Sequence, residues 1–203
     1  AADKGHARAT TMLADCYRQG KGVEQDTERA IKLYVAAARR GDSTVVANFT
    51  PLADQQADVF ACRLLSECYS SGAGVAVDKA KAQAYADKAA QAGDPKCLLT
   101  MALTHYNNGR RAEAFPYFER GALAGNVQAA YFYGLMLYDG DGTAQDRPKG
   151  LNYLQQAAEA GHAAACARLG EIFLNGDGMT QNLAKGFELT RQAAEKGNGR
   201  AQW

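Results

Sequence analysis

Three histidines and five cysteines are the side chains of this chain best suited to bind a metal or to act in nucleophilic chemistry. His6 and His162 stand in the same local sequence, Gly-His-Ala, which indicates one structural position used twice. His105 has no cysteine or carboxylate beside it at the spacing that metal ligands need. We therefore predict no catalytic residue and no metal site.

The cysteines fit a structural role better than a chemical one. No Cys-x-x-Cys pair occurs, which disfavours a structural zinc site. Cys16 and Cys68 occupy one matching place in the sequence, and Cys62 and Cys166 occupy another, as expected of small buried thiols. Cys62 with Cys97 remains the one candidate disulfide.

One pattern recurs along the chain. It has four full copies and one shortened copy, and the last two full copies are 36 residues apart. The full copies turn at Gly20, Gly72, Gly140 and Gly176, and the shortened copy runs from Gly109 to Gly125. The glycine-rich turns follow no strand and lack a Gly-Lys-Ser/Thr ending, so no nucleotide cofactor is predicted. Self-similarity at this period is typical of stacked repeat proteins, which usually present a binding surface.

Each copy predicts a first helix with one apolar stripe. Large residues recur at i, i+3 and i+4, and a small residue beside them lets the neighbouring helix approach closely. The trios are Leu13, Cys16 and Tyr17; Leu65, Cys68 and Tyr69; Tyr133, Met136 and Leu137; and Leu169, Ile172 and Phe173. The small residues are Ala14, Ser66, Gly134 and Gly170.

A glycine then ends the first helix, and a side-chain cap starts the second one. The predicted caps are Asp26, Asp78, Asp146 and Asn182. The expected buried face of the second helix is Ala30, Leu33, Tyr34, Ala37 and Ala38 in the first copy and Phe187, Thr190, Ala193 and Ala194 in the last.

This layout resembles the Sel-one-like repeat family, a relative of the tetratricopeptide repeat. The likeness rests on the pattern A-x-x-x-L-G-x-x-[YF]-x-x-G-x-G-[VM]-x-x-[DN], which residues 165–182 match nearly throughout. An alanine-rich second helix and a glycine follow, and the likeness covers almost the whole chain. The resemblance implies an all-α fold, a right-handed α-α superhelix (solenoid) of about five helix-turn-helix repeats.

We predict a single repeat array over residues 1–203. Its units are expected at about 5–41, 58–93, 94–125, 126–161 and 162–197, with partial units at both ends, as in a piece of a longer array. The third unit lacks the usual turn and joins its helices tightly at Gly109. Residues 42–57 form an insertion, which either carries a binding loop or folds back to cover a seam between units.

In arrays that resemble this one, the first helices line a concave face on which a protein or peptide partner binds. Carrying the tetratricopeptide groove positions over to this sequence predicts a set of partner-binding residues. They are Arg63, Glu67, Thr104, Asn107, Tyr131, Leu135, Tyr138 and Glu171. Tyr131, Leu135 and Tyr138 share one helix face, which is either an exposed hot spot or packed on the third or fifth unit.

Composition excludes several classes of function. The net charge of +1 gives no reason to expect nucleic-acid binding, and no apolar run approaches the roughly 20 residues that span a bilayer. The resemblance implies a bacterial, non-enzymatic adaptor that binds protein, in the cytoplasm or the periplasm. It leaves two alternatives: an immunity protein that neutralises a secreted toxin such as a lipase, and a hydrolase or penicillin-binding activity suspected of cysteine-rich relatives.

Overall fold

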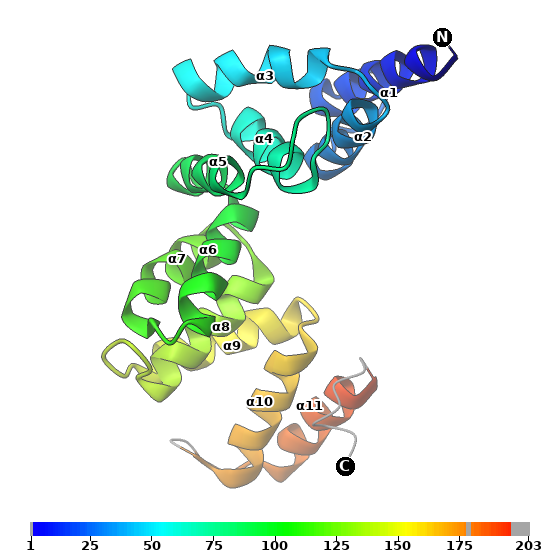
Figure 1. The fold of residues 1–203 in the computed structure, drawn as a ribbon. Helices are drawn as coiled ribbons and strands as arrows, with labels where there is room; N and C mark the ends of the chain where they lie inside the picture. Colours follow the sequence, from blue (N-terminus) through cyan, green and yellow to red (C-terminus); the bar gives the residue numbers. More distant parts are fainter. Residues whose placement is uncertain (1, 178–179, 196–203) are drawn as a thin grey trace. The chain divides into compact units, whose positions relative to one another are not determined.

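The computed structural model describes residues 2–177 and 180–195, which form helices and no strand (Figure 1). The helices are α1 (Ala2–Gln19), α2 (Thr27–Arg39), α3 (Thr44–Gln55), α4 (Val59–Ser71), α5 (Lys79–Gln91), α6 (Pro95–Asn107), α7 (Arg111–Leu123), α8 (Val127–Asp139), α9 (Arg147–Glu159), α10 (Ala163–Asn175) and α11 (Leu183–Glu195). The predicted all-α fold of paired, stacked helices is confirmed. The chain forms two compact units, residues 1–97 and 98–203.

The predicted caps start the second helices. Asp26, Asp78 and Asp146 each accept a hydrogen bond from the backbone N–H three residues on, at 2.8, 3.0 and 3.1 Å. Asn182 does the same for α11, with its Oδ1 3.0 Å from the N–H of Lys185. Each cap satisfies a donor that the helix leaves unpaired and stabilises the helix by about 1 kcal/mol. All four caps are therefore confirmed.

The predicted glycines end the first helices. α4, α8 and α10 each end at a glycine in the left-handed conformation, with φ of 69° at Gly72, 73° at Gly140 and 67° at Gly176. The third unit is joined tightly, as predicted, because residues 108–110 alone connect α6 to α7. These turns set the two helices of each hairpin against each other.

In the unit formed by residues 1–97, the insertion is a helix and not a loop. α3 buries Val45, Phe49 and Ala53 at i, i+4 and i+8, and it packs on α2 and α4 (Figure 1). The Phe49 ring centre lies 5.0 Å from that of Tyr34 and 5.6 Å from that of Phe60. Of the two alternatives, the one in which the insertion folds back over a seam therefore holds.

In the unit formed by residues 98–203, α9 crosses α8 at two glycines. A Cβ on Gly150 would lie 2.7 Å from the Tyr138 nitrogen, and one on Gly134 would lie 2.9 Å from the Leu154 nitrogen. The expectation that a small residue admits the neighbouring helix is therefore correct at Gly134. The predicted stripe residues Tyr133, Met136 and Leu137 are buried.

Two apolar residues that were predicted to be buried are exposed. Leu13 is 44% exposed and Phe187 is 69% exposed, although both were expected to be covered. α1 buries the face that carries Ala7 and Ala14, and α11 buries the face that carries Gly186 and Ala193. Leu13 and Phe187 point away from those faces.

Candidate protein-interaction surface

The predicted partner-binding residues differ in exposure. Thr104, Asn107 and Glu171 are exposed, Glu67, Tyr131 and Leu135 are partly buried, and Arg63 and Tyr138 are buried. Within residues 98–203 they lie on successive first helices, with Thr104 and Asn107 on α6, Tyr131, Leu135 and Tyr138 on α8, and Glu171 on α10. Arg63 and Glu67 belong to α4, in the unit formed by residues 1–97.

Arg63 and Asp94 are the buried members of an ionic cluster. Arg63 is 6% exposed, its guanidinium donates a hydrogen bond to Glu28 on α2, and its Nη1 lies 3.6 Å from Asp94 Oδ2. Burial disfavours the charge, but the hydrogen bond to Glu28 and the charge of Asp94 outweigh it and raise the pKa of Arg63. Asp94 also caps α6 by accepting the N–H groups of Lys96 at 3.1 Å and Cys97 at 2.8 Å. Arg63 therefore connects helices and is not a surface residue.

Glu67 lies at the outer edge of the same cluster. Its Oε1 is 3.2 Å from Lys96 Nζ, which is also 3.8 Å from Glu28 Oε2. Exposed ion pairs of this kind stabilise a fold by at most about 1 kcal/mol. Glu67 therefore keeps a carboxylate that a partner could approach.

Tyr138 packs inside the protein. It is 1% exposed, and its hydroxyl donates a hydrogen bond to the backbone oxygen of Asp177 at 2.5 Å. Arg147 and Arg168 lie over its ring, with guanidinium carbons 5.4 and 5.5 Å from the ring centre. The exposed hot-spot alternative is therefore wrong for Tyr138, and the alternative that it packs on the fifth unit is confirmed.

Tyr131 and Leu135 keep part of their surface accessible. The Tyr131 ring stacks on His162 with centres 4.6 Å apart, and it meets Phe132 edge-on at 5.1 Å. His162 caps α10, because its Nδ1 accepts the N–H of Ala165 at 3.3 Å, and burial lowers the pKa of its imidazole. The shared structural position predicted for His6 and His162 is therefore wrong, because His162 caps α10 whereas His6 lies inside α1.

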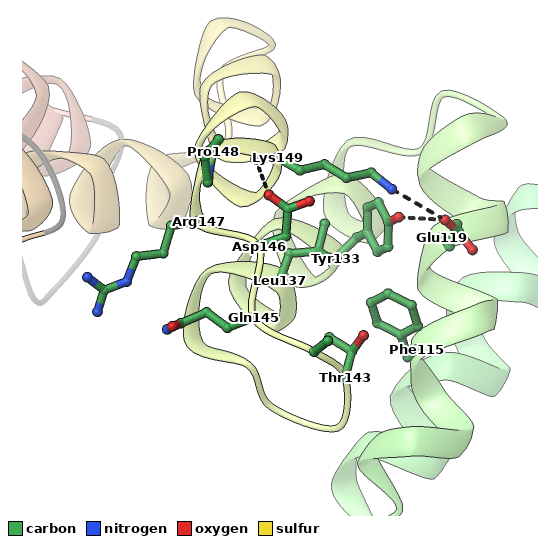
Figure 2. Close-up of a pocket in the computed structure, with 11 residues that line it drawn as sticks. Phe115, Glu119, Tyr133, Leu137, Thr143, Gln145, Asp146, Arg147, Pro148 and Lys149 are labelled. Carbon is green, nitrogen blue, oxygen red and sulfur yellow. Dashed lines mark hydrogen bonds and ion pairs between the residues drawn. The ribbon is translucent and has the colours of Figure 1, made fainter.

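One open pocket was not predicted from the sequence. It has a volume of about 610 Å³ and lies between α7, α8 and the start of α9. Figure 2 shows the Tyr133 hydroxyl and the Lys149 ammonium directed at the same carboxylate of Glu119, with Phe115 beside them. Tyr133 donates to Glu119 Oε1 at 2.5 Å, and Lys149 Nζ lies 3.8 Å from that oxygen. Burial and the hydrogen bond to Glu119 raise the pKa of Tyr133, so its hydroxyl stays protonated and is no nucleophile.

A cation over an aromatic ring recurs in all four full hairpins. It stands three residues after the cap of the second helix. The pairs are Arg29 over Tyr17 at 4.5 Å, Lys81 over Tyr69 at 5.3 Å, Lys149 over Tyr133 at 5.3 Å and Lys185 over Phe173 at 4.4 Å. The spacing of the cation from the cap is visible in the sequence and could have identified these contacts.

The described residues offer little for catalysis or metal binding. All five cysteines are free, so the candidate Cys62–Cys97 disulfide is not formed, and Cys62 Sγ instead lies 3.8 Å from the backbone oxygen of Ala53. Burial raises the pKa of Cys68 to about 11 and that of Cys97 to about 12, so both stay protonated thiols. His105 does have a carboxylate nearby, with its Nδ1 2.9 Å from Glu113 Oε2, but no group of three metal-ligating side chains occurs in the described part of the chain.

Membrane insertion was not predicted from the sequence. Among the described helices, none combines the length and the apolar character needed to cross a bilayer.

Comparison with known proteins agrees with the all-α repeat fold. The family model of the Sel1 repeat matches residues 7–42, 59–94, 127–162 and 163–198. A protective antigen of uropathogenic Escherichia coli with an SLR fold is similar at 25% identity and a TM-score of 0.71, over 100% of this chain and 48% of that one. The chain thus spans about half the length of that protein.

Two further solved structures are similar at lower identity. A Sel1 repeat protein from Oxalobacter formigenes matches at 23% identity and a TM-score of 0.62, over 98% of this chain and 74% of that one. The immunity protein Pa5087 from Pseudomonas aeruginosa matches at 20% identity and a TM-score of 0.46, over 97% and 68%. The last likeness is too low to bear on function.

Proposed function

We propose that this chain, which belongs to the Sel1 repeat family, is a non-enzymatic module that binds a partner protein or peptide along α6, α8 and α10. Sel1 repeats generally mediate protein–protein interactions. No feature of the described residues favours the immunity or hydrolase alternative over this one.

The observation that carries the proposal is the mixed surface of these three helices. Tyr131 and Leu135 on α8 are partly buried, and the first helices before and after α8 carry exposed polar residues, Asn107 on α6 and Glu171 on α10. Binding hot spots have this anatomy, with a fixed aromatic residue surrounded by polar groups that exclude water. His162 stacks on Tyr131 and so holds the ring in place, which lowers the entropy that binding must remove.

Fewer of the tetratricopeptide groove positions therefore remain candidates for partner binding in this chain. Thr104, Asn107, Tyr131, Leu135 and Glu171 are the residues we propose for the partner site, and Glu67 is a candidate in the other unit. Arg63 and Tyr138 are left out because their polar atoms already bind other parts of the chain.

The experiment is a comparison of captured proteins. The full chain is immobilised as wild type, as Asn107→Arg with Glu171→Arg, and as Asn152→Arg, an exposed change on the second helix α9. Proteins bound from a lysate are quantified by mass spectrometry, and circular dichroism checks each variant for native helicity. We expect a set of proteins that the double variant loses at least tenfold and that Asn152→Arg retains. Equal capture by all three proteins would refute the proposed surface.

A further inference from the structure

A second cavity lies between α9, α10 and α11. Its volume is about 220 Å³, below the several hundred Å³ usual for small-molecule sites but enough for one large side chain. Its apolar lining consists of Ala158, Leu169, Phe173 and Leu189, and its polar lining consists of Gln155, Glu159, Lys185 and Gln192. An apolar side chain from outside could therefore be covered here on several sides.

The cavity faces away from the proposed partner surface. Successive residues of a helix are turned by about 100°, so Leu169 and Phe173 lie roughly opposite Glu171 on α10. Besides this side of α10, the cavity is lined by the second helices α9 and α11, whereas the proposed partner surface is formed by first helices alone. A ligand in this cavity would thus not occupy the proposed partner surface, which lies on the opposite side of α10.

The pocket of Figure 2 occupies the equivalent place one repeat earlier. A shift of 36 residues takes Glu119 to Gln155, Tyr133 to Leu169, and Lys149 to Lys185. In the earlier pocket Glu119 supplies a carboxylate to Lys149 (Figure 2). In the later cavity an amide stands in its place.

This replacement leaves Lys185 without an ion pair, although a carboxylate, Glu159, also lines the cavity. Lys185 Nζ lies 4.4 Å from the centre of the Phe173 ring, and within residues 2–177 and 180–195 no carboxylate lies within ion-pair distance of it. Gln155, which could have carried that carboxylate, instead donates to Glu159 Oε1 at 2.9 Å. The cavity thus combines an apolar lining with a cation that lacks the counter-charge its repeat partner has.

We infer that this cavity binds a segment of a partner protein in which an apolar side chain, phenylalanine or leucine, stands next to an aspartate or glutamate. The apolar side chain fills the space lined by Leu169, Phe173 and Leu189. The acidic side chain pairs with Lys185 and so restores the interaction that Glu119 provides within the chain to Lys149. The surface is additional to the proposed partner site and does not depend on it.

The first test uses blocked tetrapeptides as probes of the full chain. The peptides are acetyl-Ala-Asp-Phe-Ala-amide, the same peptide with asparagine for aspartate, and the same peptide with alanine for phenylalanine. NMR with labelled leucine methyl groups follows Leu169 and Leu189 during titration. We expect the first peptide to shift both signals with millimolar affinity, the asparagine peptide to bind about threefold more weakly, and the alanine peptide at least tenfold more weakly.

Variants that carry the residue of the preceding repeat at the equivalent position make the test specific. Gln155→Glu copies Glu119 and gives Lys185 a carboxylate from its own chain, so it should weaken the aspartate peptide about threefold and leave the asparagine peptide unchanged. Gln156→Glu adds the same charge at an exposed neighbouring position outside the cavity and should change neither. Leu189→Tyr copies Tyr153 and should fill the cavity, so that neither the aspartate peptide nor the asparagine peptide binds.

Three results would overturn the inference. Unmoved Leu169 and Leu189 signals with the aspartate peptide would show that the cavity does not bind it. Equal affinity of the aspartate and asparagine peptides would remove the role of Lys185. Equal weakening by Gln155→Glu and Gln156→Glu would show only a general effect of charge.

Discussion

Replacing Gly150 by alanine tests the contact on which the α8–α9 hairpin depends. A Cβ at this position would lie 2.7 Å from the Tyr138 nitrogen, 2.8 Å from the Gly134 oxygen and 2.9 Å from the Tyr138 Cα. All three atoms belong to the backbone of α8, so no side-chain rotation can relieve the contact. The two helices would have to separate.

Two opposing effects set the size of the change. Alanine favours a helix over glycine by about 1 kcal/mol. Adding a methyl group to a closely packed contact costs about 1–3 kcal/mol, and the upper part of this range applies because rigid atoms surround the site. We therefore expect Gly150→Ala to lower the free energy of unfolding by about 1–2 kcal/mol, and the Tm of this 203-residue chain by about 2–8 °C.

The equivalent glycine one repeat later provides the matched control. A Cβ on Gly186 would meet mainly the Leu174 side chain, at 2.7 and 2.8 Å, and a leucine side chain can move. Gly186→Ala should therefore change Tm by less than Gly150→Ala does. Thermal unfolding followed by circular dichroism measures both. A Gly150→Ala variant as stable as the wild type, or more stable, would refute the close contact.

Two further predictions concern helix α3, which the insertion forms, and the His162 cap of α10. Phe49→Ala should lower the free energy of unfolding by about 3–5 kcal/mol, because Phe49 is buried against Tyr34 and Phe60. It should also make α3 sensitive to protease, whereas Asn48→Ala, a change at an exposed position, should have neither effect. An α3 that stays protected from protease without Phe49 would contradict its packing role. Burial lowers the pKa of His162, and the hydrogen bond that caps α10 requires an unprotonated Nδ1. The contribution of His162 to stability is therefore complete above a pH of about 6.5 and is lost as the pH falls through the lowered pKa of the folded state. The urea midpoint should therefore fall less between pH 7.5 and pH 5.5 in His162→Asn, which copies the Asn126 cap, than in the wild type, and an equal fall in both would remove His162 as the cause.

Local chemistry made much of the fold predictable from the sequence. A cap needs one acceptor side chain beside a helix start, and a left-handed helix end needs a glycine, so Asp78 and Gly72 identify their positions without knowledge of the rest of the chain. The same holds for the tight link at Gly109. What periodicity could not give was the exposure of each face, since Leu13 and Phe187 have the spacing of core residues and yet lie in the open.

The candidate site was less predictable because it depends on contacts between distant residues. Arg63 is polar and stands at a groove position, and only the structure shows that Glu28, 35 residues earlier, binds its guanidinium. Tyr138 likewise meets the backbone of Asp177, which lies 39 residues later. The helicity of the insertion was not predicted, because a 12-residue helix is marginal by itself and α3 is stabilised by the packing of Phe49 on distant residues.

Comparing the repeats shows which contacts are common to all four full hairpins and which differ between the two pockets. A cation three residues after the cap is unfavourable for the helix dipole by about 0.3–1 kcal/mol, because it stands near the positive end. All four full hairpins nevertheless have one, and in each it lies over a ring, a contact that returns a similar amount. Where leucine replaces the usual ring at position 137, Tyr133 one turn earlier takes over under Lys149. The ring contact therefore accounts for the cation, and the carboxylate does not, since Glu119 becomes Gln155 one repeat later while the lysine stays. Because this second position changes from Glu119 to Gln155 without loss of the hairpin, the charge of a pocket can differ from one repeat to the next.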